Sequence, residues 1–161
     1  MELTPTAVER EYEWVREREP VVPLINETRE ILGDAFGVEV GNVTEEQYHA
    51  EVDAVFANGD VGVNVAALVG LLRELDVAGD YPGFVVDEFL GRKLAATIAG
   101  GEPWGLLAES TFHVADVFTH GGAGDAAGAD DLDAALAAGF QTRLPGWPWT
   151  EEDSPFTVDR P

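Results

Sequence analysis

The feature that most constrains the fold of this chain is a repeated helical spacing of its apolar residues. Apolar side chains recur three and four residues apart in successive segments, and these segments begin or end near a proline, a glycine or a capping residue. No segment shows a sustained alternation of apolar and polar residues between turn signals, which is the pattern of a half-buried strand. The sequence therefore predicts an all-α protein, an irregular bundle of six or seven helices joined by short loops.

Local capping signals predict where several helices begin and end. Thr4 can cap a first helix that stops before Pro20. The clearest start is a capping box, in which the Thr44 hydroxyl accepts from the Gln47 N–H and the Gln47 side chain accepts from the Thr44 N–H. This helix is expected to end at Asn58-Gly59, a left-handed stop.

Periodicity predicts the other helices and separates a single helical domain, residues 1–143, from an extended C-terminal arm, residues 144–161. The arm is rich in proline and tryptophan, and a flexible glycine and alanine spacer is expected at about residues 121–128. The further predicted helices are 23–35, ending near Gly33 or Gly37, 63–75, 82–99, ending at Gly100, 102–120, and 130–138, ending at Gly139.

The charge of the chain limits its partners. It contains 31 acidic and 9 basic residues, a net charge of −22, no cysteine and a single lysine, Lys93. This composition is typical of halophilic proteins, whose stability depends on salt because molar salt screens repulsion between carboxylates; an acidic mesophilic protein is the alternative. Phosphate binding relies on clusters of Lys and Arg, so nucleic acid and anionic membrane surfaces are disfavoured. No apolar run approaches the roughly 20 residues of a membrane span and no secretory signal opens the chain, so we expect a soluble, cytoplasmic protein.

A polar stripe in the segment 102–120 is the sharpest candidate for chemistry. Glu109, His113, Asp116 and His120 follow at intervals of four, three and four residues, which places them within a wedge of roughly 60° on one helix face. Imidazole and carboxylate groups in this arrangement can bind zinc, iron or manganese. Further ligands would come from other helices, and the available groups are His49, Glu45, Glu46, Asp53, Asp87 and Glu88. The alternative is a solvent-facing strip of surface pairs, and no cofactor is predicted beyond this candidate metal.

Two of the four tryptophans, Trp147 and Trp149, lie in the predicted arm. Large aromatic side chains are costly to expose, so they either staple the arm over the bundle or anchor a partner protein. The sequence is compatible with both roles.

No motif in the chain identifies a reaction. There is no cysteine and no phosphate-binding glycine loop, and Ser110 lies near His113 without an oxyanion-hole motif. We therefore expect a non-catalytic cytoplasmic protein that acts through protein–protein contact, as an adaptor or assembly chaperone. The alternative is a metal-binding helical protein with hydrolytic or redox chemistry, and a third option is a homodimer whose arms exchange between subunits.

Overall fold

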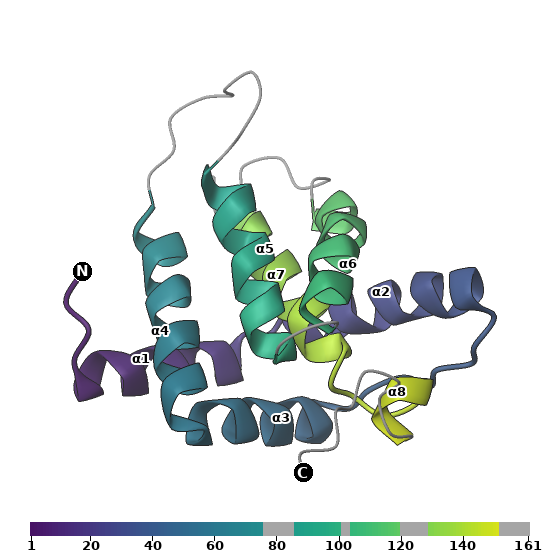
Figure 1. Ribbon diagram of the computed structural model, residues 1–161, viewed down its shortest axis with the longest axis horizontal. Helices are drawn as coiled ribbons and strands as arrows, with labels where there is room; N and C mark the ends of the chain where they lie inside the picture. The colour runs from purple at the N-terminus through teal and green to yellow at the C-terminus, as the bar shows by residue number, and fades with distance from the viewer. Residues whose placement is uncertain (76–85, 101–103, 120–128, 152–161) are drawn as a thin grey trace, which may run out of the picture.

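The computed structural model describes residues 1–75, 86–100, 104–119 and 129–151, and these form eight helices and no strand (Figure 1). The all-α prediction is thereby confirmed. The helices are α1 (Pro5–Glu17), α2 (Val21–Phe36), α3 (Glu45–Ala57), α4 (Gly59–Glu74), α5 (Val86–Ala99), α6 (Trp104–Thr119), α7 (Ala129–Gln141) and α8 (Pro148–Glu151). The predicted spacer, residues 121–128, lies outside the described residues.

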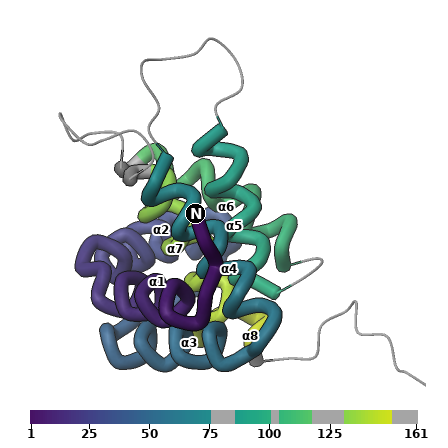
Figure 2. The backbone as a smooth tube through the Cα atoms, turned by 90° about the vertical axis from the view of Figure 1, so that its left-hand side faces the viewer, coloured from purple at the N-terminus to yellow at the C-terminus, as the bar shows by residue number. Residues whose placement is uncertain are grey.

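Helix α7 is the central element of the bundle and packs against α5, α6 and α2 (Figure 1). Every residue from Asp131 to Thr142 is buried. A helix that is enclosed on all sides needs small side chains to let its neighbours approach, and α7 supplies four alanines and a glycine between residues 134 and 139. Helices α1, α3 and α4 pack against one another on another side of the molecule (Figure 2).

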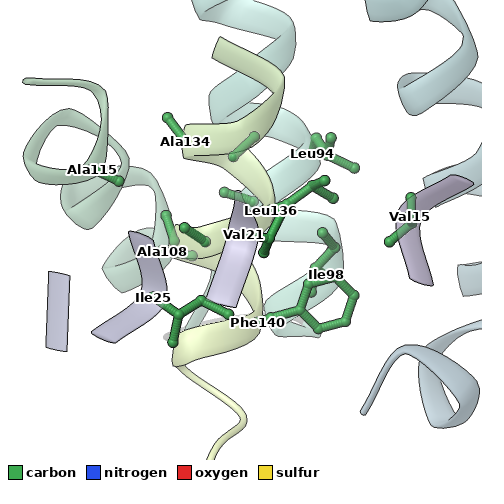
Figure 3. Close-up of a cluster of buried hydrophobic side chains, with 14 of the residues drawn as sticks. Val15, Val21, Ile25, Leu94, Ile98, Ala108, Ala115, Ala134, Leu136 and Phe140 are labelled. Atoms are coloured by element: carbon green, nitrogen blue, oxygen red, sulfur yellow. The ribbon is translucent and has the colours of Figure 1, made fainter. Parts of the chain in front are cut away.

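The hydrophobic core includes the region where α2, α5 and α6 meet α7 (Figure 3), and it continues into buried residues of α1, α3 and α4. Fully burying one large aliphatic or aromatic side chain stabilises a fold by about 1.5–3 kcal/mol, so this region provides much of the driving force for folding. The core side chains labelled in Figure 3 include Ile25 of α2, Leu94 and Ile98 of α5, Ala108 of α6, and Leu136 and Phe140 of α7.

The capping prediction for α3 is confirmed in both of its bonds. The Gln47 N–H donates to the Thr44 hydroxyl over 3.2 Å, and the Thr44 N–H donates to the Gln47 side chain over 3.0 Å. Of the glycines expected near helix ends, Gly37 and Gly100 have the left-handed φ angles of 67° and 87°.

Two glycines predicted as stops have other roles. Gly59 has no positive φ and is the first residue of α4, because the chain turns at Asn58. Gly139 lies inside α7, where a Cβ atom would come within 2.8 Å of the Ile98 Cβ on α5. Gly139 therefore permits the close approach of two helices and does not end one.

The membrane test covers the described residues alone. No single helix there is long and apolar enough to cross a bilayer, and the one combination that meets the length and composition requirement is α3 with α4, which is bent by 109°.

Candidate functional site

Three buried aspartates from three helices meet near one end of the bundle. Asp87 lies in the first turn of α5, Asp116 in the last turn of α6, and Asp131 near the start of α7, with exposed fractions of 4%, 6% and 8%. Asp87 and Asp116 both lie close enough to Asp131 to raise the pKa of its carboxyl group. An oxygen of Asp87 also accepts the Glu88 N–H over 2.9 Å, which fixes this carboxylate at the start of its helix.

Burial and mutual repulsion change the protonation of this cluster. Burial first, and then the hydrogen bond and negative charge of Asp87, raise the pKa of Asp131 to about 8. A protonated Asp131 has an O–H that can donate to a neighbouring carboxylate, so protonation turns a repulsive contact into a hydrogen bond. The cluster can hold a proton at neutral pH, which an exposed carboxyl group cannot do.

The described residues of the predicted metal stripe lie partly on the buried face of α6 and partly on its exposed face. Asp116 is buried, Glu109 is partly exposed and His113 is exposed, whereas His120 lies outside the described residues. The wedge lies at the edge of the buried face, where Phe112 and Asp116 are enclosed by the neighbouring helices. The stripe therefore contributes one residue, Asp116, to the aspartate cluster.

The other predicted ligands are distributed over two elements. His49 lies on α3 and is partly exposed, and its ring centroid is 6.0 Å from that of Tyr48. Helix α6, which carries the predicted stripe, packs mainly against α7, α5 and α2. Within the described ranges, no set of three His, Asp or Glu side chains is arranged to hold a metal ion. Because His120 is not described, the zinc, iron or manganese site stays a prediction.

Of the three aspartates, the sequence predicted Asp116 and, as a supplementary ligand, Asp87, but not Asp131, which lies at the start of the predicted helix 130–138. The available signal was the run Asp130-Asp131-Leu132-Asp133 at the head of an alanine-rich segment. Acidic residues in a helix that is otherwise small and apolar must either face solvent or find partners inside the fold.

The tryptophans of the arm are packed onto the bundle. Trp147 is fully buried and donates its indole N–H to the Gln141 carbonyl over 3.0 Å. Its ring stacks on Trp149 at 4.8 Å, and Trp149 stacks in turn on Trp104 of α6 at 5.6 Å. Between residues 144 and 151 the arm consists of turns and the short helix α8. These contacts favour the stapling role of the two tryptophans, and the partner-anchoring role of Trp147 and Trp149 stays a prediction.

A buried arginine ties the arm to α2. Arg29 is 2% exposed, and its guanidinium donates to the carbonyl oxygens of Gly41, Gln141 and Pro145 and lies 5.5 Å from the Trp147 ring centroid. Burial lowers the pKa of Arg29 to about 10. Arg29 lies at the edge of an open cleft of about 550 Å³ between α2 and residues 38–42, whose rim carries exposed acidic side chains. Because three of its N–H groups donate hydrogen bonds to backbone carbonyl oxygens, Arg29 has mainly a structural role.

The outward sides of α5 and α6 expose large apolar side chains. We define the α5–α6 outer surface as Val86, Phe89, Lys93, Leu106 and Val117. The apolar members are 51%, 55%, 57% and 56% exposed, in chain order, although apolar residues elsewhere on both helices are buried against α7 and each other. Lys93 is also exposed, and it makes no ion pair with a described residue.

The comparisons with known proteins identify a family. No curated protein and no solved structure matches this chain. One family model, described as Domain of unknown function (DUF7984), matches residues 1–160, which is nearly the whole chain. The chain therefore belongs to the DUF7984 family.

Proposed function

We propose that the protein acts without catalysis, by binding another protein through the α5–α6 outer surface, as an adaptor or assembly chaperone would. The observation that carries this proposal is the exposure of Val86, Phe89, Leu106 and Val117 on two helices that pack side by side. Isolated exposed apolar residues are ordinary, but several large ones on adjacent helices are typical of a contact surface.

The charges on this surface favour a particular kind of partner. Arg92 and Lys93 are adjacent and exposed on α5, in a chain whose net charge is −22. Arg92 is paired with Glu88 over 2.5 Å, which leaves Lys93 available for a carboxylate of the partner. We therefore propose a partner whose own surface combines apolar side chains with carboxylates. Such a surface is expected on other proteins of a halophilic cytoplasm, which is the setting that we propose for this chain.

The test compares three forms of the full chain as bait in extract of the source organism, kept in molar salt. The forms are the wild type, the double variant Phe89→Ser with Leu106→Ser, and the control Leu71→Ser on α4, where Leu71 is 43% exposed. Exposed substitutions change stability by roughly 0.5 kcal/mol or less, so circular dichroism should show all three folded. A partner retained by the wild type and by the control, but lost by the double variant, supports the proposal.

Two outcomes contradict the proposal. The first is a partner whose capture is unchanged in the double variant or is lost equally in the Leu71→Ser control. The second is self-association through this surface, which light scattering would detect as a wild-type dimer that the double variant turns into a monomer. That result would favour the homodimer in place of a separate partner protein.

A further inference from the structure

The last ten residues of the chain, segment 152–161, begin beside the α5–α6 outer surface. Trp149 of α8 stacks on Trp104 at the start of α6, with ring centroids 5.6 Å apart, and α8 ends at Glu151. Leu106 of the outer surface lies two residues after Trp104 on the same helix. The chain therefore enters segment 152–161 close to one end of this surface.

Segment 152–161 is long enough to follow the surface along its length. Helices α5 and α6 lie side by side (Figure 1), and Leu106 and Val117 mark the two ends of the surface on α6. These two residues are eleven positions apart, which is about 16 Å along a helix. An extended chain covers roughly 3.3–3.6 Å per residue, so Phe156, five residues after Glu151, can lie about 17 Å from it.

The composition of segment 152–161 complements that of the surface. Its sequence is EDSPFTVDRP, in which Phe156 and Val158 are the apolar residues. Side chains two residues apart point to the same side of an extended chain, so one apolar surface can accept both of them. Asp153 and Asp159 lie on either side of this pair, and Lys93 of the surface makes no ion pair with a described residue. The segment therefore combines apolar side chains with carboxylates, as a ligand of this surface should.

We propose that segment 152–161 docks on the α5–α6 outer surface of its own chain, with Phe156 and Val158 against the exposed apolar side chains and a carboxylate of the segment beside Lys93. The docked segment covers the surface until a partner protein displaces it. This regulatory role rests on the proposed function, whereas the docking itself does not.

The chain's own segment is a better occupant than that of a second copy. Each chain has a net charge of −22, so two copies repel each other as they approach. A segment joined to its site by a short linker has an effective concentration in the millimolar range. A contact with a dissociation constant of about 0.1 mM would then close the surface in about nine molecules of ten.

Paramagnetic relaxation in the full chain, measured by NMR in molar KCl, tests the docking. The chain contains no cysteine, so Ser154→Cys provides a single attachment point for a nitroxide label. We expect the label to broaden the methyl resonances of Leu106 and Val117. The methyl resonances of Leu71 on α4, which is 43% exposed, are the internal control and should stay unchanged.

Two substitutions in the labelled chain separate docking from simple proximity. Phe156→Ser removes the larger apolar contact and should weaken docking about tenfold or more, so the broadening at Val117 should fall by nearly half or more. Thr157→Ser changes a side chain that points to the other side of an extended segment, so it should keep the broadening of the labelled parent. Circular dichroism should show the same helical content in both variants.

A mixed sample identifies the chain that supplies the segment. One copy carries the nitroxide without isotope label, and the other carries ¹³C-labelled methyl groups without nitroxide. Broadening in this sample would overturn the proposal, because the segment would then belong to a second copy. Broadening at Val117 that is absent, or that Phe156→Ser leaves unchanged, would also overturn it.

The capture assay for the proposed function tests the regulatory role separately. Phe156→Ser should retain about fivefold more of the partner than the wild type does, because the open fraction rises from about one-tenth to about one-half. Equal capture by the two forms would overturn regulation by the segment. The relaxation measurement needs no partner, so absent broadening contradicts the docking alone, and capture that is unaffected by Phe89→Ser with Leu106→Ser contradicts the proposed function alone.

Discussion

Replacing Gly139 with alanine should destabilise the protein, although alanine is the better helix former. Gly139 lies in the middle of the contact between α7 and α5. An added methyl carbon would lie 2.8 Å from the Ile98 Cβ, 3.1 Å from the Ile98 Cγ2 and 3.1 Å from the Ala95 carbonyl oxygen. The Cβ and the carbonyl oxygen are fixed to the backbone of α5, so a side-chain rotation cannot relieve the clash.

The expected size of the effect is a difference between two opposing contributions. Overpacking of a rigid core contact costs about 1–3 kcal/mol, and contacts this short on backbone-fixed atoms belong at the upper end of that range. Replacing glycine by alanine inside a helix recovers up to about 1 kcal/mol. The net loss in the free energy of unfolding for Gly139→Ala should therefore be about 2 kcal/mol.

Urea unfolding followed by far-ultraviolet circular dichroism, in molar KCl, gives this difference from the midpoint if the slope is unchanged. The control is Gly59→Ala at the start of α4, where an added Cβ meets nothing within 4 Å and φ is not positive. This control should be neutral or stabilising by up to about 1 kcal/mol. A Gly139→Ala variant as stable as the wild type would refute the argument that position 139 requires glycine because α5 and α7 pack closely there.

Three further perturbations test separate parts of the fold. Thr44→Ala removes a cap confirmed at the start of α3 and should lower the free energy of unfolding by about 1 kcal/mol in urea; an unchanged midpoint would contradict this. Arg29→Met keeps much of the buried volume but leaves three carbonyl oxygens without their charged donor, so a loss of about 3 kcal/mol or more is expected, and a loss below about 1 kcal/mol would show that these bonds add little. The net charge of −22 predicts that the unfolding temperature rises between low salt and molar KCl, and equal temperatures would argue against the halophilic interpretation.

The features that the sequence predicted correctly depend on residues close together in the chain. The capping box joins Thr44 to a residue three positions away, and the left-handed glycines Gly37 and Gly100 each follow directly after the last residue of a helix. In each case the physical cause lies within one helical turn, so the sequence contains it.

Glycine has two uses that look alike in a sequence, which explains the wrong predictions at Gly59 and Gly139. It permits a left-handed turn, and it also permits a backbone or side chain to approach closely. The choice at Gly139 is made by Ile98, which is 41 residues earlier and on another helix. Periodicity within 130–138 contains no information about that neighbour.

The site residues were harder to predict for the same reason. Helical spacing placed Glu109, His113 and Asp116 on one wedge of α6, but it could not locate the boundary between buried and exposed surface that runs through the wedge. That boundary is set by α5 and α7, which enclose Asp116 and leave His113 in solvent. A wedge of roughly 60° is narrow compared with a helix circumference, but wide enough to contain both environments.

The two aspartates at the head of α7 show what a sequence cannot specify by residue type alone. Asp131 and Asp133 are separated by about 200° around the helix axis, so they face opposite sides, and both are 8% exposed. Asp133 meets Arg18 and is neutralised by a cation, whereas Asp131 meets two other aspartates and has a pKa near 8. The same residue type in one helix therefore has two different electrostatic environments. Because both environments require partners that lie far away in the chain, the arrangement of the helices is what gives the aspartate cluster its chemistry.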